Sequence, residues 1–242
     1  LLDSKDEVIK EFGEYVYDKV FVHYTAKQWN IPIEQVDTSV INRVPVILGY
    51  DDRYFQDKYQ FMPKNGYNEI FENMLSHKNI DIELQKDAKD LLEIKNNKIY
   101  VDGLEYKGEV IYSGALDELL SYQYGALPYR SLNLEFTDYK ENYYQPSSVV
   151  NYPNDEKFTR ITEFKYLSNQ IVKDNTTILR EYPLTYDYKN SKHIPYYAIL
   201  NDENKKLYEK YYSLVKDIKN FHLCGRLAEY KYYNMDAVIK RA

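Results

Sequence analysis

Aromatic and cationic side chains gather early in the chain. Its only tryptophan, Trp29, closely follows Tyr24, and Arg43 comes soon after. A tryptophan or tyrosine ring offers a rigid apolar face with a polar edge, which suits the CH face of a pyranose. A guanidinium group matches two phosphate oxygens at once. This grouping predicts a site for a sugar and a phosphate, whereas the alternative is that Trp29 simply ends a helix and packs into a core.

The elements that would position these residues can be predicted from the pattern around them. Ser4-x-x-Glu7 is a capping box ahead of apolar residues spaced four apart, so one helix should run from about Lys5 to Phe21. Tyr24 and Trp29 would then lie at or just beyond its C-terminal end. A strand is predicted over residues 44–48, a turn over 49–53 and a returning strand over 54–61. Asp51 and Asp52 are adjacent in this segment, and we interpret them as turn residues rather than as an acid–base pair.

The pattern changes beyond Tyr129. Period-two alternation predicts four strands of an antiparallel sheet with one solvated face, at 131–137, 147–152, 160–167 and 177–182. Shorter strands are predicted at 80–84, 91–94, 98–101, 109–112 and 221–224, and helices after Gly66, at 116–122, at 202–216 and from about Asp236. The order is not a regular α/β alternation. It predicts an α+β, or mixed α/β, fold with pieces of two subdomains interleaved.

Composition excludes several classes of protein. The formal charge is −6, with 32 basic and 38 acidic residues, which argues against a nucleic-acid partner. No apolar run is long enough to span a membrane, and no signal peptide opens the chain. The single cysteine, Cys224, fits a reducing cytoplasm. The four histidines are scattered without ligand spacing, so no metal site is predicted.

A set of collinear motifs, from about Tyr15 to the end of the chain, resembles the UDP-galactopyranose mutase family. The motifs are Tyr24-Thr25-x-Lys27-Gln28-Trp29, Asn42-Arg43-Val44-Pro45-Val46, Asp51-Asp52-Arg53-Tyr54-Phe55, Pro63-Lys64-x-Gly66-Tyr67, Tyr112-Ser113-Gly114-x-Leu116-Asp117, Thr159-Arg160-Ile161-Thr162-Glu163, Arg180-Glu181-Tyr182, Pro195-Tyr196-Tyr197 and Gly225-Arg226-Leu227…Tyr230-Lys231-Tyr232…Met235-Asp236. Two departures are Ala228-Glu229, where the family usually has Gly-Thr, and Asn234, where it usually has an aspartate.

The resemblance implies a split domain layout and a flavin cofactor. Residues 1–40 would form a helical element that leads to Trp29, and residues 40–65 and 129–200 an antiparallel substrate-binding sheet. Residues 78–122 and 219–242 would return to a Rossmann-like FAD-binding domain. No G-x-G-x-x-G fingerprint occurs and the first residue is Leu1, so we expect a piece of a longer protein whose fingerprint lies upstream. FAD would be required in its reduced form.

The resemblance also implies roles for particular residues. Arg43 and Arg160 would be catalytic and flank the diphosphate of a UDP-sugar, with Trp29 beside the sugar and Tyr24 near the uracil. The other implied substrate contacts are Thr25, Gln28, Tyr54, Asn151, Tyr182, Tyr197, Tyr232 and Asn234. The implied flavin contacts are Gly225, Arg226, Tyr232, Met235 and Asp236. For Tyr182, ordinary sheet packing stays an equal alternative.

The activity implied by the resemblance is that of a flavin-dependent isomerase. It would interconvert UDP-galactopyranose and UDP-galactofuranose through an adduct between flavin N5 and the sugar, for cell-surface polysaccharide synthesis. Two alternatives remain open: a mutase for another nucleotide sugar, N-acetylated or 6-deoxy, and a non-catalytic, tyrosine-rich carbohydrate-binding module. A UDP-sugar is the expected partner, and a homodimer is an open alternative. We expect this chain alone to bind FAD weakly or not at all and to be inactive.

Overall fold

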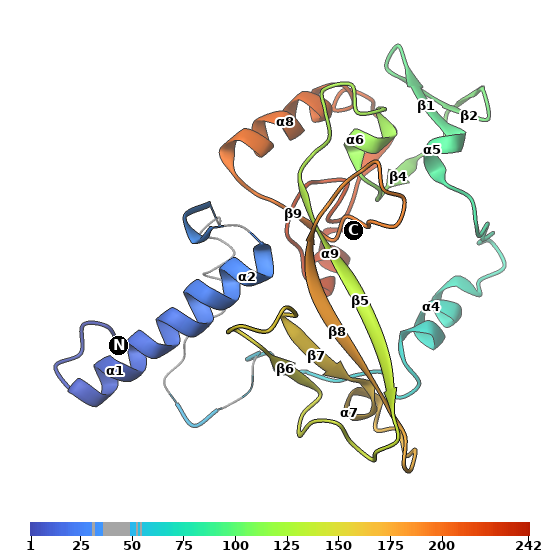
Figure 1. Ribbon diagram of the computed structural model, residues 1–242. Helices are drawn as coiled ribbons and strands as arrows, with labels where there is room; N and C mark the ends of the chain where they lie inside the picture. The colour runs from blue at the N-terminus through green and yellow to red at the C-terminus, as the bar shows by residue number, and fades with distance from the viewer. Residues whose placement is uncertain (31, 36–48, 52, 54) are drawn as a thin grey trace. The chain divides into compact units, whose positions relative to one another are not determined.

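The computed structural model describes residues 1–30, 32–35, 49–51, 53 and 55–242 (Figure 1). The chain divides into two compact units. Unit 1 comprises residues 1–28, 38–83 and 133–182, and unit 2 comprises residues 29–37, 84–132 and 183–242. The fold is mixed α/β, with mainly antiparallel strand pairing, as predicted. The predicted subdomain boundaries stay a prediction.

A nearly continuous helical segment opens unit 1. It consists of α1 (Glu7–Val16), the π-helix η1 (Tyr17–Tyr24) and α2 (Thr25–Trp29). The predicted capping box is wrong, because the N-cap is Asp6, whose carboxylate accepts from the backbone N–H groups of Val8 and Ile9. Asp6 satisfies those orphan donors two residues later than predicted. The helical segment also continues past the predicted end and carries Tyr24 and Trp29 within it.

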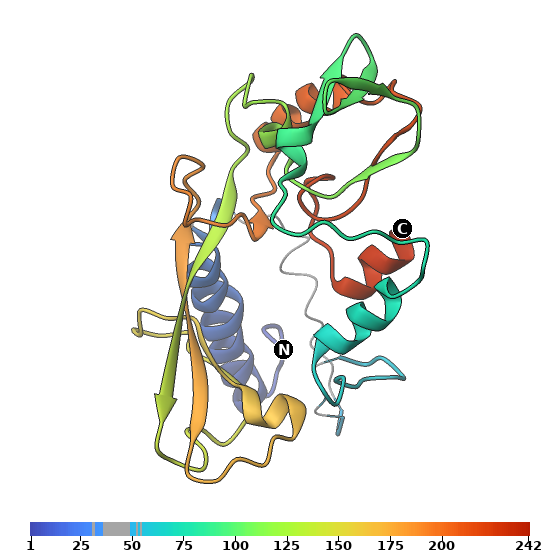
Figure 2. The same ribbon diagram turned by 90° about the vertical axis from the view of Figure 1, so that its right-hand side faces the viewer.

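The sheet of unit 1 carries one part of the candidate site. Its strands are β6 (Val149–Asn151), β7 (Arg160–Glu163), β8 (Thr176–Thr185) and β5 (Tyr129–Tyr139), in that order. β7 is antiparallel to both β6 and β8. The predicted strand 160–167 is wrong beyond Glu163, where α7 (Phe164–Ser168) begins, drawn in yellow in Figure 2. The helical turn allows the amino group of buried Lys165 to reach the carbonyl oxygens of Asn142, Val172 and Asn175.

A further helix of unit 1, α4 (Tyr67–Leu75), forms where the sequence predicted it. The strands predicted at 54–61 and 80–84 are wrong, since the described residues of both segments have no regular structure. Ile80, Ile82 and Leu84 are exposed, so these alternating residues have no core to cover. A segment of alternating apolar residues normally forms a strand because burial of its apolar face stabilises the strand.

Unit 2 contains two small sheets and most of the buried hydrophobic residues. An antiparallel sheet consists of β1 (Leu92–Lys95), β2 (Lys98–Val101) and β3 (Leu104–Tyr106). β4 (Val110–Tyr112) and β10 (Phe221–Leu223) pair in parallel, and β9 (Tyr197–Ala198) pairs with the first residues of β5. The helices are η2 (Ile33–Gln35), α5 (Ala88–Leu91), α6 (Leu116–Leu119), α8 (Asp202–Ser213) and α9 (Met235–Arg241).

The core of unit 2 is rich in tyrosine. Leu116, Tyr129, Tyr211 and Tyr230 are all buried within one hydrophobic cluster. Buried tyrosine hydroxyls need partners, and Tyr211 and Tyr230 donate to the backbone carbonyls of Gly125 and Pro128. Some of the many tyrosines therefore pack in the core and also hold loops in place through hydrogen bonds to backbone carbonyls.

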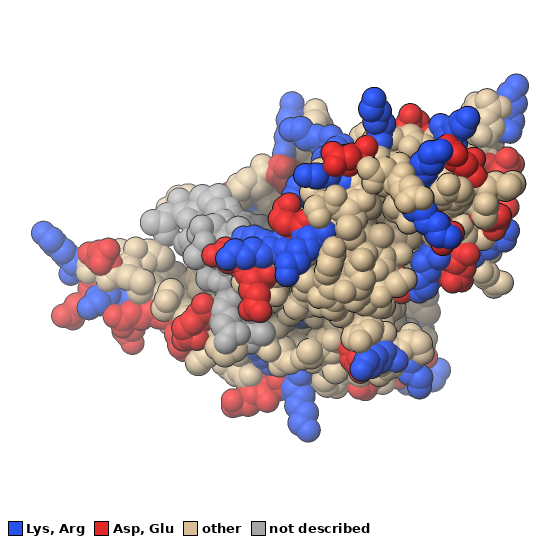
Figure 3. Space-filling model, turned by 90° about the horizontal axis from the view of Figure 1, so that it is seen from above, with Lys and Arg blue, Asp and Glu red and all other residues tan. Residues whose placement is uncertain are grey.

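The charged residues do not segregate by sign. On the face shown in Figure 3, lysine and arginine side chains lie among aspartate and glutamate side chains. Such a mixed surface agrees with the nearly balanced charge of the sequence. Among the described residues, no helix combines the length and the apolar character that crossing a bilayer requires.

Candidate functional site

Arg160 is the centre of a polar group in unit 1. In the sheet register, it lies opposite Asn151 of β6 on one side and Glu181 of β8 on the other. Its Nε lies 3.6 Å from Oε2 of Glu181. Residues directly opposite one another on antiparallel strands project from the same face of the sheet. Period-two strand geometry therefore gathers a cation, an amide and a carboxylate on one face.

Tyr24 joins this group from the helical segment. Its hydroxyl donates to Oδ1 of Asn151 at 2.8 Å and accepts from Nη2 of Arg160 at 3.1 Å. Tyr24, Asn151 and Arg160, three predicted site residues, are thus joined by hydrogen bonds within unit 1. We call Tyr24, Asn151, Arg160 and Glu181 the arginine group.

Lys27 fastens the helical segment to the sheet beside the arginine group. Its Nζ donates to the carbonyl oxygen of Tyr152 at 2.6 Å and lies 4.0 Å from the carboxylate of Glu156. Burial lowers the pKa of Lys27, and the nearby carboxylates partly oppose this. The hydroxyl of Thr25 donates to the carbonyl oxygen of Val20 within the helix, and its contact with substrate stays a prediction.

Tyr182, an implied substrate contact, lies apart from the arginine group. It follows Glu181 on β8, so its side chain leaves the opposite face of the sheet. There it packs edge-on against Phe158. Arg180 shares this face, stacks on Phe158 and donates to the hydroxyls of Tyr139 and Tyr144. This surrounding favours the packing interpretation of Tyr182, and its role in substrate binding stays a prediction.

A second group of predicted residues meets in unit 2. The rings of Tyr197 and Tyr232 stack with centroids 5.2 Å apart, and the Trp29 ring lies 6.2 Å from the first and 6.1 Å from the second. The guanidinium of Arg226 lies 5.0 Å from the ring centroid of Tyr197 and 5.5 Å from that of Tyr232. We call Trp29, Tyr197, Tyr232 and Arg226 the aromatic group.

Arg130 supports the aromatic group and was missed by sequence reasoning. It is 2% exposed, and its guanidinium lies 6.0 Å from the Trp29 ring and 5.7 Å from the Tyr197 ring. The register of β5 with β9 places Arg130 directly opposite Tyr197. A buried arginine is rare unless it is paired, and the predicted strand 131–137 begins just after Arg130, so no signal in the sequence marked this residue. Glu181 was also missed, although its motif was recognised.

Trp29 ends a helix and packs into a core, as one interpretation of the sequence proposed, and its place beside a sugar stays a prediction. It is the last residue of α2 and is 5% exposed, so it ends a helix and is buried. It is also surrounded by three predicted ligand-binding side chains of its own unit. The indole is therefore buried by packing that includes the side chains of the aromatic group.

The predicted flavin contacts follow the parallel strand pair of unit 2. Ser113 follows β4, and Gly225 closely follows β10 with a φ of +110° that favours glycine. Ligands of parallel sheets bind at the carboxyl ends of strands. The N–H of Gly225, however, donates to Oε2 of Glu229 at 3.2 Å. Met235 and Asp236 begin α9, and Asn234 is its N-cap residue without a side-chain capping bond.

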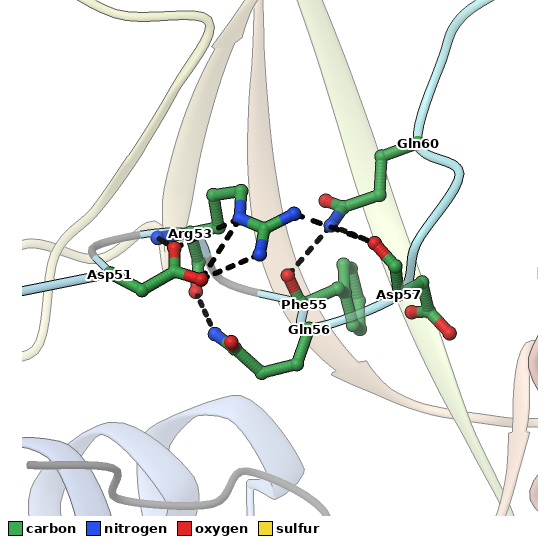
Figure 4. A network of polar contacts seen from close by, with 6 residues as sticks. All are labelled: Asp51, Arg53, Phe55, Gln56, Asp57 and Gln60. Carbon is green, nitrogen blue, oxygen red and sulfur yellow. Dashed lines mark hydrogen bonds and ion pairs between the residues drawn. The ribbon is translucent and has the colours of Figure 1, made fainter. Parts of the chain in front are cut away.

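Two predicted site residues, Arg43 and Tyr54, lie outside the described residues. Convergence of Arg43 with Arg160 therefore stays a prediction. Nearby, Arg53 folds back on its own turn, with its Nε 2.9 Å from Oδ1 of Asp51 (Figure 4). These bonds lower the pKa of Asp51 to about 2. Asp51 thus acts as a turn residue. Across the described parts of the chain, no cluster of histidine, cysteine and carboxylate side chains is suited to a metal ion.

Comparisons of the sequence with known proteins point to one family. A family model described as UDP-galactopyranose mutase matches residues 19–232. The chain is 37% identical over 239 residues to a protein of Klebsiella pneumoniae named "Probable UDP-galactopyranose mutase", covering 98% of this chain and 58% of that relative. A dTDP-fucopyranose mutase of Escherichia coli is 34% identical, over 98% of this chain and 61% of the relative.

A UDP-galactopyranose mutase of Mycoplasma pneumoniae is 33% identical, over 97% of this chain and 59% of the relative. The chain thus spans about three-fifths of the length of these relatives. The family match covers most of the chain and includes every residue of the arginine group and of the aromatic group. This chain belongs to the UDP-galactopyranose mutase family.

Proposed function

We propose that this chain forms the substrate-binding part of a flavin-dependent isomerase that interconverts UDP-galactopyranose and UDP-galactofuranose. The observation that carries the proposal is the arginine group, in which Arg160 is held by Tyr24 and Glu181 on one sheet face. A permanently charged, oriented guanidinium suits a diphosphate that must be held as it leaves the sugar and returns. Family membership supports the choice of a nucleotide sugar.

The chemistry assigned to these side chains is charge stabilisation and orientation. Arg160 would balance charge that develops on the departing diphosphate oxygens, and the hydroxyl of Tyr24 keeps the guanidinium in place. The flat faces of the aromatic group would orient the sugar ring against its apolar side. Keeping the departing diphosphate in place until it returns to the sugar is a form of catalysis by proximity.

The residues after β4 and β10 fit a flavin, because parallel strand ends and the positive φ of Gly225 allow a ligand to approach the backbone. Arg226, Tyr232, Met235 and Asp236 would contact it from the following segment. In its reduced form the flavin supplies, when bound, the nucleophile for the anomeric carbon of the sugar. A Rossmann-like domain that completes this site, a cytoplasmic location and a homodimeric assembly belong to the proposal.

A mutase for another nucleotide sugar is the second candidate function. The observation that favours it is the relative named dTDP-fucopyranose mutase, which is 34% identical to this chain. Asn234, where the family usually has an aspartate, lies two residues beyond Tyr232 of the aromatic group. A changed charge beside the sugar would alter preference among sugars that differ by a hydroxyl, since unpaired buried polar groups dominate such discrimination.

The proposal is tested by expressing the whole open reading frame that contains this chain. The purified protein, with FAD reduced by dithionite, is incubated with UDP-galactofuranose, and in a parallel reaction with dTDP-fucofuranose. Chromatography of the nucleotide sugars should show the corresponding pyranose from the preferred substrate. Conversion only of the dTDP-sugar would select the second candidate. Sugar binding that is indifferent to flavin reduction, without any conversion, would instead identify a non-catalytic module.

A further inference from the structure

Glu229 stands at one of the two positions where the sequence departs from the family pattern. It is 7% exposed, although glutamate is almost never this buried without a partner. It lies in the segment 225–233, which connects β10 to the start of α9 and contains Arg226 of the aromatic group. A buried carboxylate in place of the usual threonine calls for a specific set of contacts.

The contacts of Glu229 reach both ends of this segment. One carboxylate oxygen, Oε2, accepts the backbone N–H of Gly225 at 3.2 Å. The other, Oε1, accepts from the hydroxyl of Tyr233 at 3.4 Å and from Nε of Arg241 in α9 at 3.2 Å. The amino group of Lys231 lies 3.7 Å from the same oxygen. The carboxylate therefore closes the segment into a loop tied at its first and last residues.

Arg226 lies inside this closed loop and depends on it. Its Nε donates to the carbonyl oxygen of Tyr233 at 2.6 Å. The same residue, Tyr233, donates its hydroxyl to Glu229. Glu229 therefore fixes Tyr233 through the side chain, and Tyr233 fixes Arg226 through the backbone. This leaves the guanidinium against the rings of Tyr197 and Tyr232.

The charge of Glu229 is balanced by groups other than Arg226. Arg241 and Lys231 supply two positive charges at the carboxylate. Within the described part of the chain, Arg226 forms no ion pair with a carboxylate, and its recorded contacts are a carbonyl oxygen and two rings. Glu229 can thus orient Arg226, and the positive charge of the Arg226 guanidinium stays available to an anionic ligand.

We propose that Glu229 is a positioning residue, which closes the segment 225–233 and holds Arg226 and Tyr232 in the aromatic group beside Trp29. Its effect on ligand binding rests on the proposed function, because Arg226 must contact the phosphate-bearing substrate or cofactor. Its effect on the aromatic group is independent of that function. The two parts can be measured separately.

The structural part is tested by fluorescence, because Trp29 is the only tryptophan of the chain. In Glu229→Ala, loss of the closure should let Tyr232 move away from the indole, so iodide should quench Trp29 several-fold more strongly and emission should shift to the red. Glu229→Gln keeps one acceptor oxygen, for the N–H of Gly225, and its amide NH2 can donate to the hydroxyl oxygen of Tyr233, so quenching should lie between wild type and Glu229→Ala. Glu209→Ala, which removes an exposed carboxylate from α8 of the same unit, is the matched control.

If Glu229→Ala fails to fold by circular dichroism, Tyr233→Phe carries the test. This change removes only the hydroxyl that donates to Glu229 and preserves the carbonyl that accepts from Arg226. It should increase quenching of Trp29 by a smaller factor. Unchanged quenching in both variants, or equal damage in Glu229→Gln and Glu229→Ala, would overturn the proposal.

The ligand part uses a double-mutant cycle in the protein expressed from the whole open reading frame. Glu229→Ala alone should weaken binding of UDP or of FAD by about tenfold, the range expected for a misplaced charge-assisted hydrogen bond. In a background of Arg226→Ala, it should cause no further loss, because Glu229 acts through Arg226. Additive losses would refute action through Arg226. If quenching changes but affinity does not, the proposed role of Arg226 in ligand binding would be wrong, whereas the proposed closure of the segment by Glu229 would be supported.

Discussion

Arg160 and Glu181 face each other across strands β7 and β8, with Nε of the arginine 3.6 Å from a carboxylate oxygen of the glutamate. The glutamate thus holds one edge of the guanidinium, while Nη2 at another edge reaches the hydroxyl of Tyr24. An arginine that is already oriented loses less side-chain entropy when a phosphate binds. The sheet therefore pre-organises the cation before any ligand arrives.

Replacing Arg160 with alanine should remove this cation without disturbing the proposed flavin contacts in unit 2. We expect UDP affinity to fall at least tenfold, because a hydrogen bond to a charged group contributes about 1.5–3 kcal/mol. Turnover in the protein from the whole open reading frame should be lost, while FAD affinity stays unchanged. Calorimetric titration with UDP and flavin absorbance measure the two effects. Lys157→Ala, an equal charge loss at an exposed position nearby, is the control, and normal turnover in Arg160→Ala would disprove the assigned role.

Replacing Tyr24 with phenylalanine isolates the hydroxyl that joins Asn151 to Arg160. The ring and its packing stay, so the protein should fold with an unchanged melting temperature within a few degrees. The change removes one hydrogen bond to neutral Asn151 and one from the charged guanidinium of Arg160, and the less firmly held guanidinium should bind UDP about fivefold more weakly, a loss of about 1 kcal/mol. The measurement is the same titration at low and high salt. An unchanged affinity would mean that the hydroxyl is dispensable for holding Arg160.

Asp117 should make the stability of the chain depend on pH. It is 1% exposed, accepts the N–H of Leu127, and burial raises its pKa from 3.8 to about 6. The folded state therefore binds more protons than the unfolded state between these values, and stability falls as pH rises through this window. The ionised carboxylate should cost about 3 kcal/mol at pH 7.

Urea unfolding of wild type and Asp117→Asn at pH 4 and pH 7 measures this term. The amide keeps an acceptor for Leu127 but cannot ionise, so the difference in unfolding free energy between the two proteins should shift by about 3 kcal/mol in favour of the variant at the higher pH. Parallel pH profiles for the two proteins would show that Asp117 titrates normally in the folded chain.

Replacing Lys165 with methionine should destabilise unit 1. The buried amino group donates to three backbone carbonyls, of Asn142, Val172 and Asn175, and methionine would leave these acceptors without their donor. Unsatisfied buried groups cost about 1–3 kcal/mol each, so we expect a loss of roughly 3 kcal/mol after relaxation. Chemical denaturation measures it against Lys173→Met, an exposed position in the same loop. Equal stability of the two variants would contradict the prediction.

Local signals in the sequence were sufficient for some elements of the fold. The helix after Gly66 and the strands predicted at 91–94 and 98–101 formed close to where they were expected, and Asn96 and Asn97 between these strands have the positive φ values that tight hairpin turns require. The strand that ends before Gly225 was predicted from its apolar run. In each case the deciding interaction lies within a few residues of the chain.

Other features were decided by distant partners that a single sequence does not reveal. The alternation through Lys165 predicted a strand, but three distant carbonyls favoured a helical turn. The prediction of Trp29 in the site was accompanied by no signal for Arg130, which the register of β5 with β9 places opposite Tyr197. The motif around Arg226 was recognised from its glycine and tyrosines, whereas the closure by Glu229 depends on Arg241 in the next helix.

The two-stranded pairing of β4 with β10 has a practical consequence for handling this polypeptide. Within the described residues, neither strand pairs with any strand except the other, so the outer row of backbone donors and acceptors on each has no strand partner there. Such open edges are templates for additional extended chains. The 242-residue polypeptide should therefore self-associate on concentration, and short β-forming peptides that dock along these borders should keep it dispersed.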